Sequence, residues 1–334
     1  MQKREPQCAI PQTDLDVRSL ERSVEGWLLD GDIRQLSDRS LGNRRMVVDK
    51  LVWFLKDRAY ERCGAAEIRQ FLAYLNHGHE DEGGRWGNPQ CDKPVGPSTV
   101  QTYYVHVRTF FRWLVDEGLL TVSPVEGIRV PISRPDQIQP FSEAQIKALL
   151  AAARRSNHPR RDEAIVALLV DTGIRASELC GLTLEMVDLQ NGHLTVHGKG
   201  GKSRPIYFGL ATKRALYQYL REDPRDEADA VFLGDRGTNS GEGLTRSGLQ
   251  KLIARLGRVA GIQATRCSPH TFRHTAAVFF LRNGGNGFAL QKMLGHTTLK
   301  MTNHYVALAD ADVERQHRQY SPMDGIKKNI SKSR

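Results

Sequence analysis

Six side chains in the C-terminal half of this chain have types that together could act on a phosphodiester. They lie in five short strings: TGIRASEL (172–179), HGKGGKSR (197–204), SPHTFRHT (268–275), LGH (294–296) and HY (304–305). The six candidates are Arg175, Lys199, His270, Arg273, His296 and Tyr305. Guanidinium groups bind phosphate oxygens through bidentate, charge-assisted hydrogen bonds. A tyrosine can act as a nucleophile, and lysine or histidine can transfer protons. Because no cluster of carboxylates accompanies these residues, the set predicts phosphodiester chemistry with no metal and no cofactor.

The same strings suggest other sites, but each lacks a residue that the alternative needs. GKS at 201–203 is typical of a nucleotide-binding P-loop, yet that loop requires a glycine where Val196 stands. HTFRH has the two histidines of a zinc-protease helix, yet Thr271 replaces the required glutamate. Taken alone, Arg175 is best explained as a helix-start arginine paired with Glu178.

In this order the five strings resemble the tyrosine recombinase (phage integrase) family, in its two-domain Xer-like form. Tyr305 follows His296 by nine residues, and the helical segments of 14–118 are similar to the SAM-like core-binding domain of that family. The resemblance implies that Arg175 and Arg273 clamp the scissile phosphate and that Tyr305 is the nucleophile.

The resemblance also assigns roles to the remaining candidates. It implies that His270 transfers the proton of the attacking tyrosine and that His296 hydrogen-bonds the phosphate. Lys199, on a β-hairpin, protonates the departing 5′-oxygen, and the nearby Lys202 is the alternative lysine. Glu178 holds the turn that carries the first arginine.

A site-specific DNA recombinase is the function that this resemblance implies. Such an enzyme forms a 3′-phosphotyrosyl intermediate and a Holliday junction as a homotetramer on double-stranded DNA with paired inverted half-sites. A partner recombinase or an accessory DNA-bending protein could take part. The long segment 77–97 and the tail beyond Pro322 favour the integration, excision or resolution of a mobile element. A housekeeping Xer-type resolvase of chromosome or plasmid dimers is the alternative, followed by a type IB topoisomerase or a non-catalytic DNA-binding regulator.

Composition agrees with a nucleic-acid partner. The chain has 334 residues and a formal net charge of +10, which favours a polyanion. Its five cysteines are scattered without a CxxC pair, a pattern that predicts a reducing, cytoplasmic setting. A DNA-binding role there would make the protein nucleoid-associated. The first residues contain no apolar signal region, and no stretch approaches 18 apolar residues, so no membrane partner is expected.

The chain is expected to be mainly α-helical with a small antiparallel β-sheet, in two domains. The predicted parts are a tail at 1–13, a helical core-binding domain at 14–122, a linker at 123–140, a catalytic α+β domain at 141–322 and a basic tail at 323–334. Since only 13 residues precede the first helix, we expect no additional arm-binding domain.

Hydrophobic periodicity places most of the helices. In the first domain we expect helices at 14–30, 38–60 and 65–76, and a fourth that starts at a Ser98–Gln101 capping box and stops at Gly118. In the second, a Ser142–Gln145 capping box opens a helix at 143–154, and helices follow at 164–170, 211–222, 245–260, 270–283 and 287–294. Alternating apolar residues around 193–208 predict a β-hairpin.

Two segments have less certain roles. Residues 77–97 are rich in glycine, proline and charge, and they predict an exposed loop that is either functional or flexible. His77, His79 and Cys91 could bind zinc, but their spacing fits no standard ligand pattern. Residues 306–320 have a narrow apolar stripe at helical spacing, which by itself also fits a helix folded back on its own domain. The family resemblance instead implies that this helix docks on a neighbouring protomer.

Overall fold

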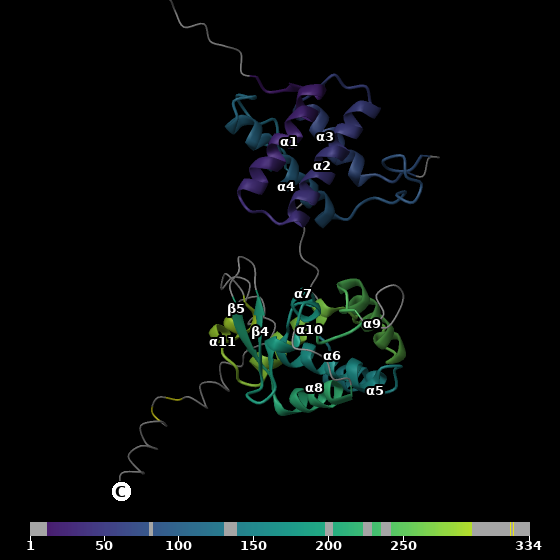
Figure 1. Cartoon of the computed structure of the whole chain (residues 1–334). Helices are drawn as coiled ribbons and strands as arrows, with labels where there is room; N and C mark the ends of the chain where they lie inside the picture. The colour runs from purple at the N-terminus through teal and green to yellow at the C-terminus, as the bar shows by residue number, and fades with distance from the viewer. Residues whose placement is uncertain are drawn as a thin grey trace, which may run out of the picture. The chain divides into compact units, whose positions relative to one another are not determined.

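The computed structural model describes residues 12–79, 83–129, 139–197, 203–222, 229–234 and 242–295, together with 321 and 323. The chain divides into two compact units, Met1–Asp136 and Gln137–Arg334, each with its own hydrophobic core (Figure 1). The division falls within the segment 123–140 that the sequence assigns to a linker. In the described part of the chain, no helix is both long and apolar enough to cross a membrane.

Four amphipathic helices form the first unit, close to the ranges that periodicity predicts. They are α1 (Val17–Ile33), α2 (Asp38–Asp57), α3 (Ala65–Asn76) and α4 (Pro97–Asp116). Their apolar faces meet in one core that contains the fully buried rings of Trp27, Phe71, Phe110 and Phe111. A two-stranded sheet, β1 (Leu15–Asp16) with β2 (Arg62–Cys63), joins the start of α1 to the segment before α3.

Two features of this unit differ from the expectation. The predicted capping box at Ser98 is wrong, because the N-cap of α4 is Gly96, two residues earlier, with Pro97 in its first turn. The fixed φ of proline suits the first helical position and needs no amide hydrogen there. Residues 123–129, which were expected in an extended linker, instead turn back onto the helices, and Val125 is fully buried in their core.

The second unit is built around one buried helix, α6 (Pro159–Thr172). It packs against α5 (Glu143–Arg154), α8 (Leu210–Glu222) and α10 (Pro269–Arg282). Further helices are α7 (Ala176–Cys180), η1 (Leu184–Met186), α9 (Arg246–Val259) and α11 (Gly287–Leu294). The Ser142–Gln145 capping box that was predicted to open α5 is confirmed by both of its hydrogen bonds.

A three-stranded antiparallel sheet of order β3–β4–β5 completes this unit (Figure 1). Its strands are β3 (Val187–Asp188), β4 (His193–His197) and β5 (Ser203–Tyr207). The register from His193↔Tyr207 to His197↔Ser203 confirms the predicted hairpin. The connection between β4 and β5, which contains Lys199 and Lys202, lies outside the described residues.

The described parts of the 77–97 loop are folded onto the first unit. Arg85 and Asn88 pair across a two-residue turn in which Trp86 and Gly87 have φ of 65° and 66°. Glycine tolerates this left-handed region, but a bulky L-residue there costs roughly 1–2 kcal/mol. The Trp86 ring compensates by packing at 5.6 Å from Trp53 and under the ammonium of Lys50, whose Nζ is 5.3 Å from the ring centroid.

His77 and His79, the histidines of the possible zinc site, each direct a ring nitrogen to a backbone carbonyl. Nδ1 of His77 is 2.7 Å from the oxygen of Ala73, and Nε2 of His79 is 2.7 Å from the oxygen of Tyr74. Within the described ranges, no three histidine, cysteine, aspartate or glutamate side chains are grouped so that they could hold a metal ion.

Because the Trp86 ring packs against Trp53 and Lys50, Trp86→Ala should destabilise the helical unit. The half-buried ring leaves less of a gap than a core tryptophan, so we expect a loss of about 2 kcal/mol in the free energy of unfolding. All four tryptophans of the chain (Trp27, Trp53, Trp86 and Trp113) belong to this unit. Urea unfolding of the full chain, followed by tryptophan fluorescence, thus reports on it. The matched control is Gln90→Ala, an exposed change in the same loop. Equal stability of the two variants would show that the loop is not anchored through Trp86.

Candidate active site

Arg175 is placed by a sharp break between two helices. α6 ends at Thr172, and Gly173 follows in the left-handed conformation with φ of 60°. A Cβ at Gly173 would lie 3.0 Å from Leu294 and 3.1 Å from Ala276, so both the backbone angle and the packing call for glycine. The chain then turns at Arg175, which is the N-cap of the short helix α7.

The side chain of Arg175 is held from two sides. Its Nη1 donates to Oε1 of Glu178 at 2.8 Å, and its backbone N–H donates to Oε2 of the same carboxylate at 3.0 Å. Its Nη2 donates to the carbonyl oxygen of Gly295 at 2.9 Å. The Arg175 side chain is 37% exposed to solvent. Its guanidinium group has five N–H donors. Arg175 is thus fixed in orientation while it still reaches solvent.

Arg273 approaches the same segment from α10. It is buried, and it donates from Nη1 to the carbonyl of Gly173 at 2.8 Å and from Nη2 to the carbonyl of Leu294 at 2.7 Å. The two arginines therefore bind consecutive carbonyls, those of Leu294 and Gly295, at the end of α11. Residues 98 positions apart in sequence are brought together directly before His296 in the chain.

His270 lies in the first turn of α10, three residues before Arg273. The helix starts at Ser268, whose Oγ accepts the N–H of Thr271, so this serine is a helix cap. Partial burial, and then the positive charges of Arg273 and Arg266, lower the pKa of His270. Its ordinary pKa is about 6.5, so the ring is neutral at pH 7 and able to accept a proton.

His274, the second histidine of the string HTFRH, lies against His270. The two Nε2 atoms are 3.1 Å apart, and the rings meet edge to face. One nitrogen must donate and the other accept, so the protonation of one ring sets the tautomer of the other. His274 is buried and therefore also fixes the position of the exposed His270 ring.

The structure adds one residue that sequence reasoning missed. Arg204, on β5, donates from Nη1 and Nη2 to the two carboxylate oxygens of Glu178 at 2.8 and 2.9 Å. It is the last residue of the string HGKGGKSR, in which only the lysines were predicted to take part in catalysis. Lys199, His296 and Tyr305, as well as the segment 306–320, lie outside the described residues.

Comparison with known proteins shows the family of this chain. Residues 139–312 match the phage integrase family. The chain is 34% identical over 240 residues to the tyrosine recombinase XerD of Pseudomonas putida, covering 70% of this chain and 78% of that protein. It is 36% identical over 241 residues to the tyrosine recombinase XerC of Corynebacterium efficiens, covering 71% of this chain and 76% of that protein.

The chain belongs to the phage integrase family. As a tyrosine recombinase it is an enzyme of site-specific recombination, as its motifs predict. Its fold is similar to that of a lambda integrase dimer bound to a COC′ core site, with a TM-score of 0.66 at 18% identity, covering 90% of this chain and 79% of that one. The Tn1549 transposon integrase in complex with transposon right end DNA gives a TM-score of 0.65 at 17% identity, covering 90% of this chain and 99% of that one. The predicted fold class is confirmed.

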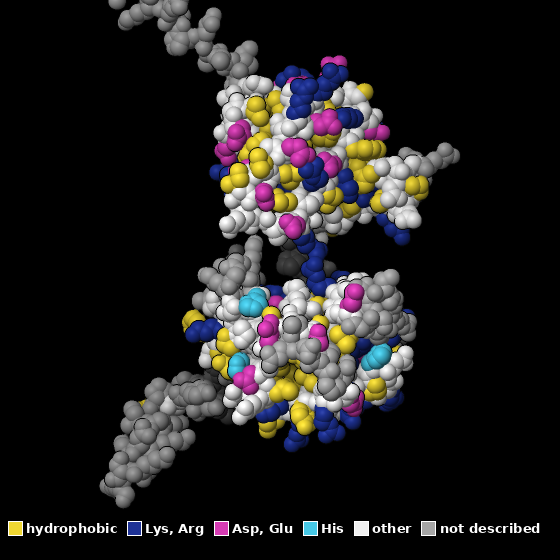
Figure 2. Space-filling model, viewed as in Figure 1, with side chains coloured by type: hydrophobic (Ala, Val, Ile, Leu, Met, Phe, Trp, Pro, Cys, Tyr) yellow, Lys and Arg dark blue, Asp and Glu magenta, His cyan; other side chains and the backbone are white. Residues whose placement is uncertain are grey.

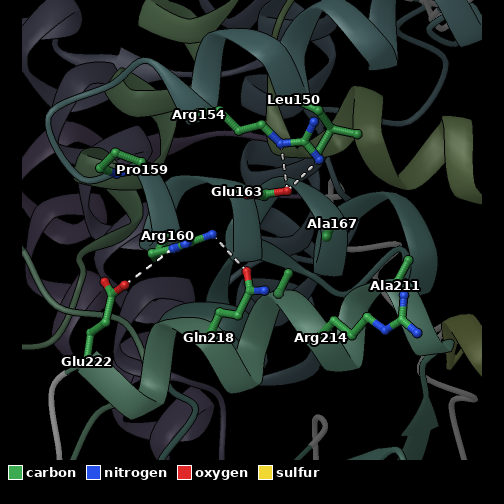
Figure 3. Close-up of a pocket in the computed structure, with 11 residues that line it drawn as sticks. Leu150, Arg154, Pro159, Arg160, Glu163, Ala167, Ala211, Arg214, Gln218 and Glu222 are labelled. Carbon is green, nitrogen blue, oxygen red and sulfur yellow. Dashed lines mark hydrogen bonds and ion pairs between the residues drawn. The ribbon is translucent and has the colours of Figure 1, made fainter.

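A separate groove of about 810 Å³ lies between α5, α6 and α8 of this recombinase (Figure 3). Arg175, His270 and Arg273 do not line it. Figure 3 shows two of its arginines paired with neighbours: Arg154 with Glu163, and Arg160 with Gln218 and Glu222. On the face drawn in Figure 2, lysine and arginine side chains gather along the edge where α5 and α8 lie. We assign no catalytic role to this groove.

Gly295→Ala should damage both the fold and the site. Gly295 has φ of 63°, and a Cβ there would lie 2.9 Å from Cζ and Nε of Arg204. Gly261 is the matched control, because its φ is 69° and nothing lies within 4 Å of its Cβ position. Both alanines should cost roughly 1 kcal/mol of backbone strain, but only Gly295→Ala should also displace Arg204 and the carbonyl that binds Arg175.

Thermal unfolding of the two full-length variants by circular dichroism, together with their rates of DNA strand cleavage, measures these effects. We expect a lower melting temperature and slower cleavage for Gly295→Ala than for Gly261→Ala. Equal cleavage rates in the two variants would contradict the importance of the Gly295 carbonyl for the site.

Proposed function

We propose that this recombinase breaks and rejoins double-stranded DNA through a 3′-phosphotyrosyl intermediate, with Arg175, Arg273, His270, Lys199, His296 and Tyr305 as its catalytic residues. The observation that carries the proposal is the convergence of Arg175 and Arg273 on the carbonyls of Leu294 and Gly295. That convergence gathers two phosphate-binding guanidiniums directly before His296 in the chain.

In the first step, the phenol oxygen of Tyr305 attacks phosphorus and its proton passes to His270. The bond from phosphorus to the 5′-oxygen breaks, and Lys199 protonates that oxygen, while His296 hydrogen-bonds the phosphate. The arginines neutralise the phosphate and stabilise the charge that develops in the transition state, a contribution that is large in enzymes of this kind. Lys202 is the alternative acid.

The second step is the reverse of the first. A 5′-hydroxyl of the partner strand attacks the phosphotyrosyl bond, and the tyrosine leaves with a proton. Because the phosphotyrosyl bond conserves the energy of the original ester, rejoining needs neither ATP nor a cofactor. Two such exchanges through a Holliday junction join two duplexes, and four protomers on paired inverted half-sites would supply the four active tyrosines.

For the biological role, we propose integration, excision or resolution of a mobile element in the cytoplasm, on nucleoid DNA. The long 77–97 loop, which departs from the family pattern, supports this proposal. Resolution of chromosome or plasmid dimers is the second candidate, and the 34% and 36% identities to proteins named XerD and XerC favour it. Adding a partner recombinase or a DNA-bending protein to a purified reaction tests whether either protein takes part.

Tyr305→Phe should bind DNA with unchanged affinity and form no covalent adduct, because only the attacking oxygen is removed. The measurement uses a nicked suicide substrate that traps the phosphotyrosyl protein, resolved by denaturing electrophoresis. Tyr320→Phe is a control with the same chemical change, outside the string that carries the candidate nucleophile. An adduct that persists in Tyr305→Phe would show that another residue attacks.

Cleavage should weaken in acid with an apparent pKa below about 6.5, since the pKa of His270 lies below the ordinary histidine value. A proton acceptor must be neutral, so the rate is full at pH 7 and falls as pH decreases through the pKa of the folded protein. Adduct formation at limiting DNA reports the titration of the free enzyme. His270→Gln should be slower and should lack this acid decline. If its pH profile kept the wild-type shape, another group would be the acceptor.

A further inference from the structure

The carboxylate of Glu178 lies between two guanidinium groups. Its Oε1 accepts Nη1 of Arg175 and Nη1 of Arg204, both at 2.8 Å, while its Oε2 accepts Nη2 of Arg204 at 2.9 Å. The Glu178 side chain is 6% exposed and that of Arg204 is 16% exposed, against 37% for Arg175. Arg204 is the inner partner of this cluster, and Arg175 is the one that faces outward.

The charges of the three groups sum to one positive charge. Arg175 with Glu178 alone would form a neutral pair, whose field at a nearby phosphate would be weak. Burial by itself would raise the pKa of Glu178, but the guanidinium of Arg204 and the N–H and side chain of Arg175 hold it below the ordinary value. The carboxylate is therefore ionised at neutral pH, and it needs a second cation if Arg175 is to act as one.

Arg204 also connects three segments of the site. It stands on β5 opposite Val196 of β4, in the hairpin whose connection contains Lys199. Its Nε is 3.5 Å from the carbonyl of Met293, and its guanidinium covers Gly295. These contacts hold Arg204 between the hairpin, the start of α7 and the end of α11, and they orient its guanidinium group toward Glu178.

We propose that Arg204 is a positioning residue that neutralises Glu178 and so leaves the positive charge of Arg175 available to the scissile phosphate. This inference rests on the proposed function of Arg175 as a phosphate clamp. It differs from a structural crosslink in one respect. A crosslink is already broken when either partner is removed, so removing the second partner gives no recovery of the rate, whereas a neutralising residue becomes unnecessary once the charge that it neutralises has gone.

The test compares Arg204→Gln, Glu178→Gln and the double variant in single-turnover adduct formation at saturating DNA. Arg204→Gln should slow the adduct by about tenfold or more, because an uncompensated carboxylate then opposes the phosphate. The double variant should be faster than Arg204→Gln alone, since both the positive and the negative charge are absent. Arg160→Gln, which breaks the ion pair with Glu222 in the groove of Figure 3, is the matched control and should keep the wild-type rate.

A second substrate gives a readout that loss of packing would not change. With a neutral methylphosphonate at the scissile position, Arg175 has less negative charge to balance, so the defect of Arg204→Gln relative to wild type should shrink. Arg204→Lys keeps a positive charge beside Glu178 and should retain more activity than Arg204→Gln. Binding to a single half-site and thermal unfolding verify that each variant is folded. If Arg204→Gln does not fold, adduct formation on the two substrates is compared in Arg204→Lys and in the double variant instead.

The outcomes separate the two levels of the proposal. If the wild-type enzyme forms no adduct, the proposed function fails and this inference fails with it. If the wild type forms the adduct but the double variant is as slow as Arg204→Gln or slower, and the methylphosphonate leaves the defect unchanged, Arg204 is only a crosslink and the inference alone is overturned.

Discussion

The hydrogen bonds that Arg175 and Arg273 donate to two consecutive carbonyls, those of Gly295 and Leu294, are the constraint on which the site depends. A backbone carbonyl orients a guanidinium without cancelling its charge, so these bonds preorganise the arginines at little electrostatic cost. They also fix the end of α11, and therefore the point in the chain where His296 follows. One set of contacts thus serves both the fold and the chemistry.

The buried helix α6 makes these contacts possible. Its residues from Ala164 to Leu169 are largely enclosed by α5, α8 and α10, so its C-terminus is held firmly. Gly173 then ends the helix in a conformation that few other residues adopt, and Arg273 binds the carbonyl of that same glycine. The core therefore fixes the position of Arg175 through a single rigid turn.

Local patterns in the sequence predicted most of the helices, the β4–β5 hairpin and the capping box at Ser142, because each depends on residues a few positions apart. The Ser98 box shows the limit of that approach, since Pro97 after a Gly96 cap starts the helix two residues earlier. The role of Arg204 was not predictable in this way. Its partners Glu178 and Met293 are 26 and 89 residues away in sequence, and α7 is too short to show a hydrophobic period.

The two arginines of the site are oriented by different means, with different electrostatic consequences. Two carbonyl oxygens accept from Arg273, and these hydrogen bonds do not offset its charge. Arg175 is held by one carbonyl and by a carboxylate, which orients it more strongly but opposes its charge. A half-exposed arginine at a helix start needs the stronger hold, because fewer neighbours restrict its rotamers. A carboxylate in that position is compatible with phosphate binding only where a third residue balances it, and the fork of Arg204 occupies that place.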